Sequence, residues 1–196
     1  MAKLYFKYGA MGCSKSAQAL ICKFNYEQRG FKVLLMKPSI DTRDIVNGKA
    51  VVKSRIGISS ECYTFDKNES LLDLFTRLNK EVKYDILIID EAQFCSEQQI
   101  NDCKEISVNI PVLCYGLKTN FKSYLFEGSK RLLEIADSIT EIKSVCSCGA
   151  KATINAMIVN GKIVSEGAEI QIGGDEKYEA MCYNCWRKKQ KEQGGL

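Results

Sequence analysis

Residues 9–16 have the types and spacing of a phosphate-binding loop: Gly9, Ala10, Met11, Gly12, Cys13, Ser14, Lys15 and Ser16. In the P-loop pattern G-x-x-x-x-G-K-[S/T], backbone N–H groups surround the phosphates, the lysine adds a positive charge and the hydroxyl binds Mg²⁺. The chain departs from this pattern because Ser14 replaces the second glycine. If position 14 needs a left-handed backbone, a side chain there costs about 1–2 kcal/mol. Taken alone, a Gly-rich turn that binds nothing is an equally good interpretation.

Two adjacent carboxylates, Asp90 and Glu91, follow the apolar residues 86–89. P-loop enzymes place an acidic residue at the end of such a strand, beside Mg²⁺. Side chains alternate along a strand, which predicts separate roles: Asp90 faces the metal, and Glu91 accepts a proton from the attacking hydroxyl as general base. For an isolated Asp-Glu pair, an acid that caps the next helix is the better interpretation. The preceding P-loop reverses that preference.

Four cysteines form two close pairs that suit a metal ion, Cys146 with Cys148 and Cys182 with Cys185. The chain contains no histidine, so a site built from these pairs has only sulfur ligands. Four thiolates complete the tetrahedral shell of zinc and leave no position for a reacting water, which predicts a structural Zn²⁺. Scattered buried thiols are the alternative. The remaining cysteines stand singly on apolar segments and are interpreted as small buried side chains: Cys13, Cys22, Cys62, Cys95, Cys103 and Cys114.

The apolar pattern predicts the scaffold for these groups, an α/β fold with a P-loop (RecA-like) parallel sheet core flanked by helices. Aliphatic stretches predict buried strands at residues 4–8, 32–36, 85–89, 112–115 and 139–143. Helices are predicted at residues 16–28, 71–78, 97–105 and 130–136. After Val145, short β-like segments at 152–159 and 162–164 indicate a new domain. We expect a nucleotide-binding core at 1–144 and a small zinc-ribbon or lasso domain with a basic tail at 145–196.

Composition limits the class of protein. With 196 residues, 45% of them apolar, the chain can form one core and a small appendage. No stretch approaches the roughly 20 apolar residues that span a bilayer, and the first residues lack the apolar region of a signal peptide. We therefore expect a cytoplasmic protein that binds no membrane. Much of the net charge of +4 comes from residues 186–191, interpreted as a solvated tail and not as a nucleic-acid site.

Several motifs in order resemble the zinc-containing, cytosolic-type (type II) thymidine kinase family: the P-loop, Asp41-Thr42-Arg43, residues 90–94, the cysteine pairs and residues 173–178. The resemblance covers nearly the whole chain. It implies that ATP donates its γ-phosphoryl group to the 5′-hydroxyl of thymidine, giving dTMP and ADP in nucleoside salvage. It also implies Mg²⁺ and a structural Zn²⁺ as cofactors, assembly into a homotetramer, and dTTP as a feedback inhibitor.

The resemblance further implies roles for single residues. Glu91 corresponds to the proton acceptor, and Arg43 offsets charge on the transferring group. The residues implied to bind ATP and Mg²⁺ are the whole of the loop, Gly9 to Ser16, together with Asp41, Asp90 and Gln93.

On the thymidine side, Phe121 and Phe126 correspond to aromatic side chains whose flat faces suit a flat base. Without the resemblance, core packing would be the better interpretation of two phenylalanines. The lasso between the cysteine pairs is implied to bind the thymine edge through backbone groups and to close the pocket with a tyrosine: Glu169, Ile170, Gln171, Ile172, Gly173 and Tyr178.

Two other functions stay open from the residues themselves. A deoxynucleoside kinase of different base preference would share every catalytic feature and differ only in the lasso. A non-catalytic nucleic-acid-binding protein would combine a zinc ribbon and basic tail with an ATPase-like core. The second alternative lacks the concentrated basic stripe with aromatic residues that such proteins carry, so we expect no nucleic-acid partner.

Overall fold

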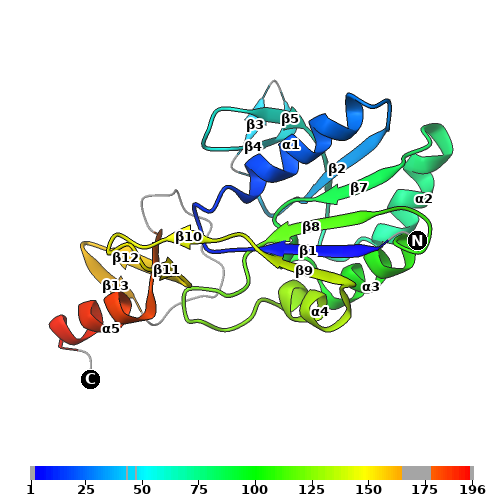
Figure 1. Ribbon diagram of the computed structural model, residues 1–196. Coiled ribbons are helices and arrows are strands. Elements are labelled where there is room, and N and C mark those ends of the chain that lie inside the picture. The colour runs from blue at the N-terminus through cyan, green and yellow to red at the C-terminus, as the bar shows by residue number, and fades with distance from the viewer. Residues whose placement is uncertain (1–2, 43, 47, 165–177, 195–196) are drawn as a thin grey trace.

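The computed structural model describes residues 3–42, 44–46, 48–164 and 178–194. Its centre is a six-stranded sheet in the order β6-β2-β7-β8-β1-β9, in which every neighbouring pair runs parallel (Figure 1). This confirms the predicted parallel sheet. The strands are β1 (Leu4–Tyr8), β2 (Val33–Pro38), β6 (Tyr63–Phe65), β7 (Ile86–Ile89), β8 (Val112–Gly116) and β9 (Ser138–Glu141).

Sequence analysis missed β6, the edge strand beside β2. Only Phe65 of its three residues is buried, whereas Tyr63 and Thr64 are exposed. Such a short strand with one buried residue has too little apolar pattern to be recognised without its partner.

Helices cover both faces of the sheet, as predicted (Figure 1). Alternating side chains give each face its own core: Leu34 and Ile89 belong to the cluster that includes residues of α2, α3 and α4, and Leu35 and Ile88 to the cluster that includes α1. The central strands β2, β7 and β8 are therefore buried on both sides, which explains their mostly aliphatic composition. The helices are α1 (Lys15–Glu27), α2 (Leu71–Glu81), α3 (Glu97–Ile106) and α4 (Glu127–Ile135).

Most of the single cysteines lie in this core. Cys13, Cys95, Cys103 and Cys114 are buried, which confirms their interpretation as small apolar side chains. Cys22 and Cys62 are only half-buried, so for these two the prediction was wrong.

A small antiparallel sheet that was not predicted lies over α1. It consists of β3 (Ile45–Val46), β4 (Lys49–Lys53) and β5 (Ser59–Glu61), with β4 in the middle. Val52 of β4 is buried against Ala19 and Leu20 of α1. This packing places the turn between β4 and β5 next to the start of α1.

The C-terminal part forms two further antiparallel sheets and a helix. The predicted β-like segment at 152–159 is interrupted at Thr153, and the predicted segment at 162–164 is a strand. The predicted domain boundary, between residues 144 and 145, falls inside β10. The elements are β10 (Ser144–Val145), β11 (Lys151–Ala152), β12 (Ile154–Val159), β13 (Lys162–Val164), β14 (Tyr178–Met181) and α5 (Tyr183–Glu192).

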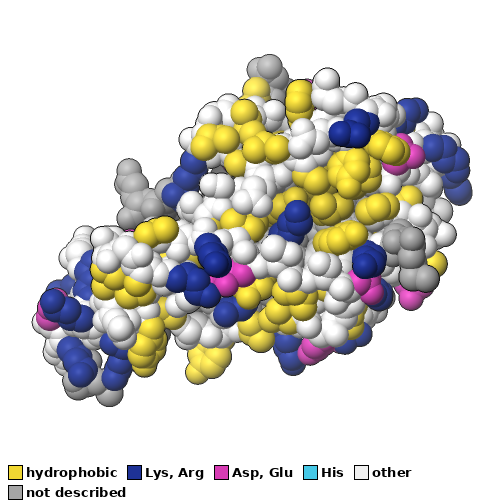
Figure 2. Space-filling view, in the orientation of Figure 1, with side chains coloured by type: hydrophobic (Ala, Val, Ile, Leu, Met, Phe, Trp, Pro, Cys, Tyr) yellow, Lys and Arg dark blue, Asp and Glu magenta, His cyan; other side chains and the backbone are white. Residues whose placement is uncertain are grey.

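The basic segment 186–191, interpreted as a solvated tail, lies within helix α5, none of whose residues is fully buried. Trp186 packs against the small C-terminal core, while the side chain of Lys188 is exposed. Figure 2 shows Lys and Arg side chains gathered at this end of the molecule. Among the described residues, no helix has the length and apolar character needed to cross a membrane.

Asn155 on β12 joins the C-terminal part to the core. Its side chain is 3% exposed, and its Oδ1 accepts a hydrogen bond from the backbone N–H of Met11 at 2.8 Å. Its Nδ2 donates to the carbonyl oxygen of Thr119 at 2.9 Å. One buried amide thus connects the loop after β1, the loop after β8 and the C-terminal sheet.

We expect Asn155→Ala to lower the free energy of unfolding by about 2–4 kcal/mol, because it leaves two buried backbone groups without partners. Urea denaturation followed by circular dichroism measures this loss. The control is Asn109→Ala, at an exposed position, which should change stability by less than about 0.5 kcal/mol. Equal stability of the two variants would contradict the linking role of Asn155.

Candidate active site

The predicted P-loop follows β1, and its last two residues, Lys15 and Ser16, are the first two of α1. Its first glycine is required by close packing, since a Cβ built on Gly9 would lie 2.3 Å from the carbonyl oxygen of Ile142. The loop therefore turns sharply at the carboxyl end of the central sheet. That position aims its backbone N–H groups and the N-terminus of α1 at one region of space, as phosphate binding requires.

Two residues of the loop have a left-handed backbone. Gly12 has φ 73°, a conformation that glycine adopts without strain. Ser14 has φ 66° and ψ 25°, which confirms that position 14 needs the conformation of the glycine it replaces. Its side chain makes no capping hydrogen bond within the described first turn of α1, so nothing there offsets the strain.

Lys15 and Ser16 begin α1 and face the pocket. Lys15 Nζ donates to the carbonyl oxygens of Ala10 at 2.9 Å and Gly9 at 3.3 Å, so the ammonium group is held over its own loop. The side chain of Ser16 lies near the carboxyl of Asp90 and lowers its pKa against the larger effect of burial. Loop and acidic residue thus meet in one pocket, as the two motifs together predicted.

Asp90 follows β7 and is 4% exposed. Its backbone N–H donates to the carbonyl oxygen of Met36 at 3.0 Å, which continues the pairing of β7 with β2. Burial, and next to it the charge of Glu91, raises the pKa of the Asp90 carboxyl from 3.8 to about 7. A buried carboxylate beside a second one favours a cation at this position.

Glu91 also has a left-handed backbone, with φ 53°. Such strain in a residue other than glycine is common at functional sites. Gln93 Nε2 donates a hydrogen bond to Glu91 Oε2, and Gln93 Oε1 accepts one from the N–H of Leu117 at 2.9 Å. These two hydrogen bonds connect the Glu91 carboxylate to the end of β8 through a side chain that is 1% exposed.

Asp41 lies at the carboxyl side of β2 and is 7% exposed. Its Oδ2 pairs with Nζ of Lys37 at 3.3 Å, and Lys37 is 1% exposed. Sequence analysis missed Lys37, although a lysine inside the aliphatic segment 33–38 was a signal. A buried pair of this kind holds Asp41 in place, because removing either partner leaves an uncompensated buried charge.

One pocket of about 620 Å³ brings most of the predicted site residues together. Gly9, Ala10 and Cys13 shape the loop but do not form the wall. Arg43, Glu169, Ile170, Gln171, Ile172 and Gly173 lie outside the described residues. The predicted residues in the wall are Met11, Gly12, Ser14, Lys15, Ser16, Asp41, Asp90, Glu91, Gln93, Phe121, Phe126 and Tyr178.

Aromatic side chains form one side of this pocket. Phe126 packs edge-to-face on Phe94, with ring centroids 5.7 Å apart, and both line the pocket. Phe121 is 3% exposed and also reaches it, and Tyr178 joins from β14. Flat apolar surfaces lie here, and charged groups lie at the P-loop, so the pocket suits a ligand with an aromatic part and a phosphorylated part.

Two wall residues that sequence analysis did not identify are Asn155 and Arg55. Asn155 is polar within an apolar strand, which was a usable signal. Arg55 belongs to the turn after β4, and its place above the P-loop follows from the packing of β4 on α1, which no local pattern indicates.

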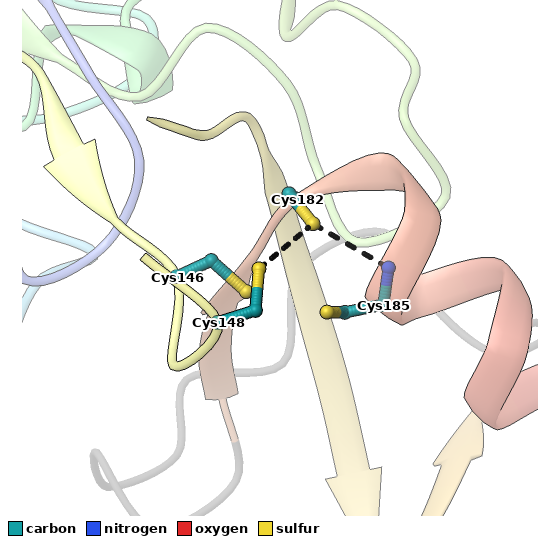
Figure 3. A group of neighbouring side chains, drawn as sticks. All are labelled: Cys146, Cys148, Cys182 and Cys185. Atoms are coloured by element: carbon teal, nitrogen blue, oxygen red, sulfur yellow. Dashed lines mark hydrogen bonds between the residues drawn. The ribbon is translucent and has the colours of Figure 1, made fainter. Parts of the chain in front are cut away.

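The four paired cysteines converge outside this pocket (Figure 3). Their sulfur atoms all lie within 4.8 Å of one another, and the sulfurs of Cys148 and Cys182 are 3.6 Å apart. Four sulfurs at about 2.3 Å from one zinc ion are about 3.8 Å from each other, so the cluster fits this ion. Cys146 and Cys148 lie at the turn from β10 to β11, and Cys182 and Cys185 lie at the start of α5.

The electrostatics of the cluster also suit a cation. Backbone N–H groups, first that of Cys148, lower the pKa of the Cys146 thiol from 9.0 to about 6. The N–H of Cys185 points at the sulfur of Cys182, at 3.4 Å. Hydrogen bonds to the neighbouring thiols, first that of Cys148, raise the pKa of the Cys185 thiol to about 12.

We expect Ser14→Gly to stabilise the protein by about 1 kcal/mol, because glycine adopts the left-handed backbone without strain. In a chain of this size that raises the melting temperature by about 2–4 °C. Calorimetry measures the shift. The control is Ser59→Gly, on the exposed strand β5, which should lower stability. A Ser14→Gly variant that melts below the parent would contradict the strain.

Comparison with known proteins gives one consistent result. The family model described as thymidine kinase matches residues 2–186. A thymidine kinase of Zymomonas mobilis is 45% identical over 93% of this chain and 94% of that protein. A thymidine kinase of Shewanella oneidensis is 41% identical over 96% of this chain and 98% of that protein. A thymidine kinase of Legionella pneumophila is 45% identical over 93% of this chain and 88% of that protein. The chain therefore belongs to the thymidine kinase family.

Proposed function

We propose that the protein transfers the γ-phosphoryl group of ATP to the 5′-hydroxyl of thymidine, giving dTMP and ADP. The observation that carries this proposal is the shared pocket: Asp90 and Glu91 line the same pocket as Lys15 and Ser16 of the P-loop. A phosphate-binding loop, a metal-binding acid and a general base are the parts that phosphoryl transfer to a hydroxyl needs. Membership of the family and the names of the relatives support thymidine as the acceptor.

On the ATP side, the residues of the P-loop bind the phosphates. Lys15 exchanges its hydrogen bonds to the carbonyl oxygens of Gly9 and Ala10 for contacts with phosphate oxygens. The N-terminus of α1 favours the negative charge of the nucleotide. Asp41, held by Lys37, lies at the edge of the same pocket and orders the loop after β2 near the phosphates.

The donor set beside the P-loop fits Mg²⁺, a hard cation that prefers oxygen ligands. Ser16 and Asp90 are the residues that would hold it, since both offer oxygen ligands in the same part of the pocket wall. When bound, Mg²⁺ neutralises charge on the transferring phosphate. The raised pKa of Asp90 means that this carboxyl gives up its proton when a cation takes that place.

In the transfer step, the 5′-oxygen of thymidine forms a bond to the γ-phosphorus while the bond from this phosphorus to the β,γ-bridging oxygen breaks. Glu91 takes the proton of the 5′-hydroxyl, and ADP leaves with the bonding electron pair. Gln93 keeps the Glu91 carboxylate aimed at the pocket. Arg43 is proposed to offset charge on the transferring group, as the family resemblance implies.

On the thymidine side, Phe121, Phe126 and Tyr178 enclose the base, and Phe94 extends the aromatic wall. The backbone of residues 169–173 is proposed to hydrogen-bond the thymine edge. A site that satisfies the polar edge of one base rejects others by leaving buried groups unpaired, which discriminates more strongly than apolar shape. The alternative, a related kinase for another deoxynucleoside, differs at this point only.

We propose that residues 145–196 form a zinc-binding unit that shapes this part of the pocket. Asn155 and Tyr178 both lie between the two cysteine pairs and both line the pocket. A structural Zn²⁺ held by Cys146, Cys148, Cys182 and Cys185 would tie the two ends of the segment together. The ion would act on folding, since four sulfur ligands leave no position for a substrate.

Homotetramer formation and inhibition by dTTP are also proposed. Support for assembly comes from apolar side chains exposed on and after α1, namely Ile21, Phe24 and Phe31. Figure 2 shows hydrophobic side chains gathered beside α1. Surfaces of this kind are often covered by a partner. dTTP carries both parts that the pocket accepts, a pyrimidine and a triphosphate.

The proposed function is tested with Glu91→Gln. We expect turnover with ATP and thymidine to fall by about 10²- to 10⁴-fold, because the amide cannot accept the proton. Affinity for a non-hydrolysable ATP analogue should stay within a factor of about three, because Glu91 does not contact the P-loop phosphates in this proposal. Product formation is measured for thymidine and for a panel of other nucleosides, which also identifies the preferred base.

The matched control for Glu91→Gln is Glu105→Gln, an exposed position on α3, which should keep the rate of the parent. Near-normal turnover of Glu91→Gln would remove it as base. Absence of dTMP formation by the parent protein, with another nucleoside phosphorylated, would favour the kinase of different base preference.

Removal of zinc should lower the melting temperature and raise the KM for thymidine much more than the KM for ATP. The physical reason is that the cluster anchors the segment carrying Tyr178, whereas the P-loop belongs to the core. Elemental analysis is expected to find one zinc ion per chain in the parent and less in Cys148→Ser.

The control is Cys62→Ser, which lies outside the cluster and should keep the zinc content of the parent. A parent protein purified without metal, and unaffected by chelators, would contradict the zinc site.

A further inference from the structure

Arg55 reaches the P-loop from outside it and lines the same pocket as Lys15. It belongs to the turn between β4 and β5 and lines the same pocket as Lys15 and Asp90. A Cβ built on Gly12, in the middle of the P-loop, would lie 3.5 Å from Nη1 of Arg55, an ordinary contact distance. The guanidinium group is therefore within reach of any anion that the loop holds.

The turn that carries Arg55 is held by its own hydrogen bonds. The N–H of Ser54 donates to the carbonyl oxygen of Ile58 at 2.9 Å, and Ser54 Oγ donates to the same oxygen at 3.2 Å. The N–H of Gly57 donates back to the carbonyl oxygen of Ser54 at 3.1 Å, and Gly57 has φ 91°. Because glycine accepts this backbone and Ser54 is 6% exposed, the turn has a defined shape.

The strand that leads into the turn is anchored on the helix of the P-loop. Val51 and Val52 of β4 are buried, and Val52 packs with Ala19 and Leu20 on α1. Lys15 and Ser16 begin that same helix. The apolar packing of β4 on α1 thus holds the turn that carries Arg55 close to the phosphate-binding groups.

The described wall of the pocket carries more acidic than basic side chains, so binding of a phosphorylated ligand needs each available cation. Within the described part of the wall, the acidic side chains are Asp41, Asp44, Asp90 and Glu91, and the cations are Lys15, Lys53 and Arg55. A triphosphate adds several negative charges to a wall that already carries these carboxylates. A planar guanidinium can bind two phosphate oxygens at once, and arginines that do so stabilise the charge that develops in phosphoryl transfer.

We infer that Arg55 binds the terminal phosphates of the nucleotide held by the P-loop, so that the β4–β5 turn is a second phosphate-binding element of this enzyme. The inference rests on the proposed function for the identity of the nucleotide. It goes beyond that function by assigning the small sheet β3-β4-β5 a task, namely to place a cation from the same chain over the P-loop.

The test compares Arg55→Gln and Arg55→Lys with the parent, and uses Arg77→Gln as control because the Arg77 side chain is 69% exposed on α2. Steady-state kinetics give KM for ATP, KM for thymidine and kcat. Calorimetric titration gives the affinities for AMP, ADP and a non-hydrolysable ATP analogue. We expect Arg55→Gln to lower kcat/KM for ATP by about 10- to 1000-fold, with KM for thymidine unchanged.

The series of nucleotides locates the contact. Affinity for the ATP analogue should fall by about tenfold or more in Arg55→Gln, and affinity for AMP should not change, because AMP lacks the terminal phosphates. Arg55→Lys should recover only part of the loss, since an ammonium group cannot reproduce the bidentate contact. Arg77→Gln should behave as the parent in every measurement.

Several results would overturn the inference. Unchanged kinetics and analogue affinity in Arg55→Gln would show that the guanidinium does not touch the nucleotide. Equal losses for AMP and for the ATP analogue, together with a lower melting temperature, would indicate a structural role. If the parent protein failed to phosphorylate thymidine, the proposed function would fail, while the nucleotide titrations would still test Arg55.

Discussion

The contact between Ser16 and the buried carboxyl of Asp90 is the interaction on which the site depends. It requires the first turn of α1 and the end of β7 to meet, and the parallel strand order brings both to one edge of the sheet. Burying that acid next to Glu91 is unfavourable by itself, as the raised pKa of Asp90 reflects. The unfavourable free energy of this burial arises at a position where binding of a cation and phosphates can offset it, which is typical of a preorganised site.

The same constraint explains the groups around this contact. Gln93 holds Glu91 through the end of β8, Lys37 holds Asp41 through a buried ion pair, and Asn155 holds the P-loop at Met11. Each of these supports a strained or charged group with a buried side chain. The left-handed backbones of Ser14 and Glu91 persist because the surrounding packing leaves no other conformation.

The C-terminal part completes the pocket and does not stand beside it as an independent appendage. Asn155 and Tyr178 lie in the wall, although the segment that carries them is joined at its two ends by the cysteine cluster. The cysteine cluster therefore lies at the base of a segment that contributes two side chains to the pocket wall. The small sheet that carries Arg55 completes the opposite side in a similar way, through the packing of Val52 on α1.

Local sequence was sufficient for features that depend on local chemistry. Short apolar segments predicted β1 without error and the other long strands to within a few residues. The signal was clearest for β2, β7 and β8, because strands buried on both faces are mostly aliphatic. The P-loop, the Asp90-Glu91 pair and the cysteine pairs were visible because their chemistry demands fixed residue types at short spacing. The need for a left-handed backbone at Ser14 followed from the glycine that the motif expects.

What only the tertiary structure decided are the relations between segments far apart in the chain. The edge strand β6 and the strands β3, β4 and β5 are short, and α5 is rich in charged and polar residues, so none of them was recognised locally; each is stabilised by a partner elsewhere. Arg55 looks unremarkable in the sequence, and Lys37 and Asn155 stand out there only as polar residues within apolar strands. Their importance arises from burial and proximity, which depend on how distant elements pack, and a linear pattern contains no direct record of that packing.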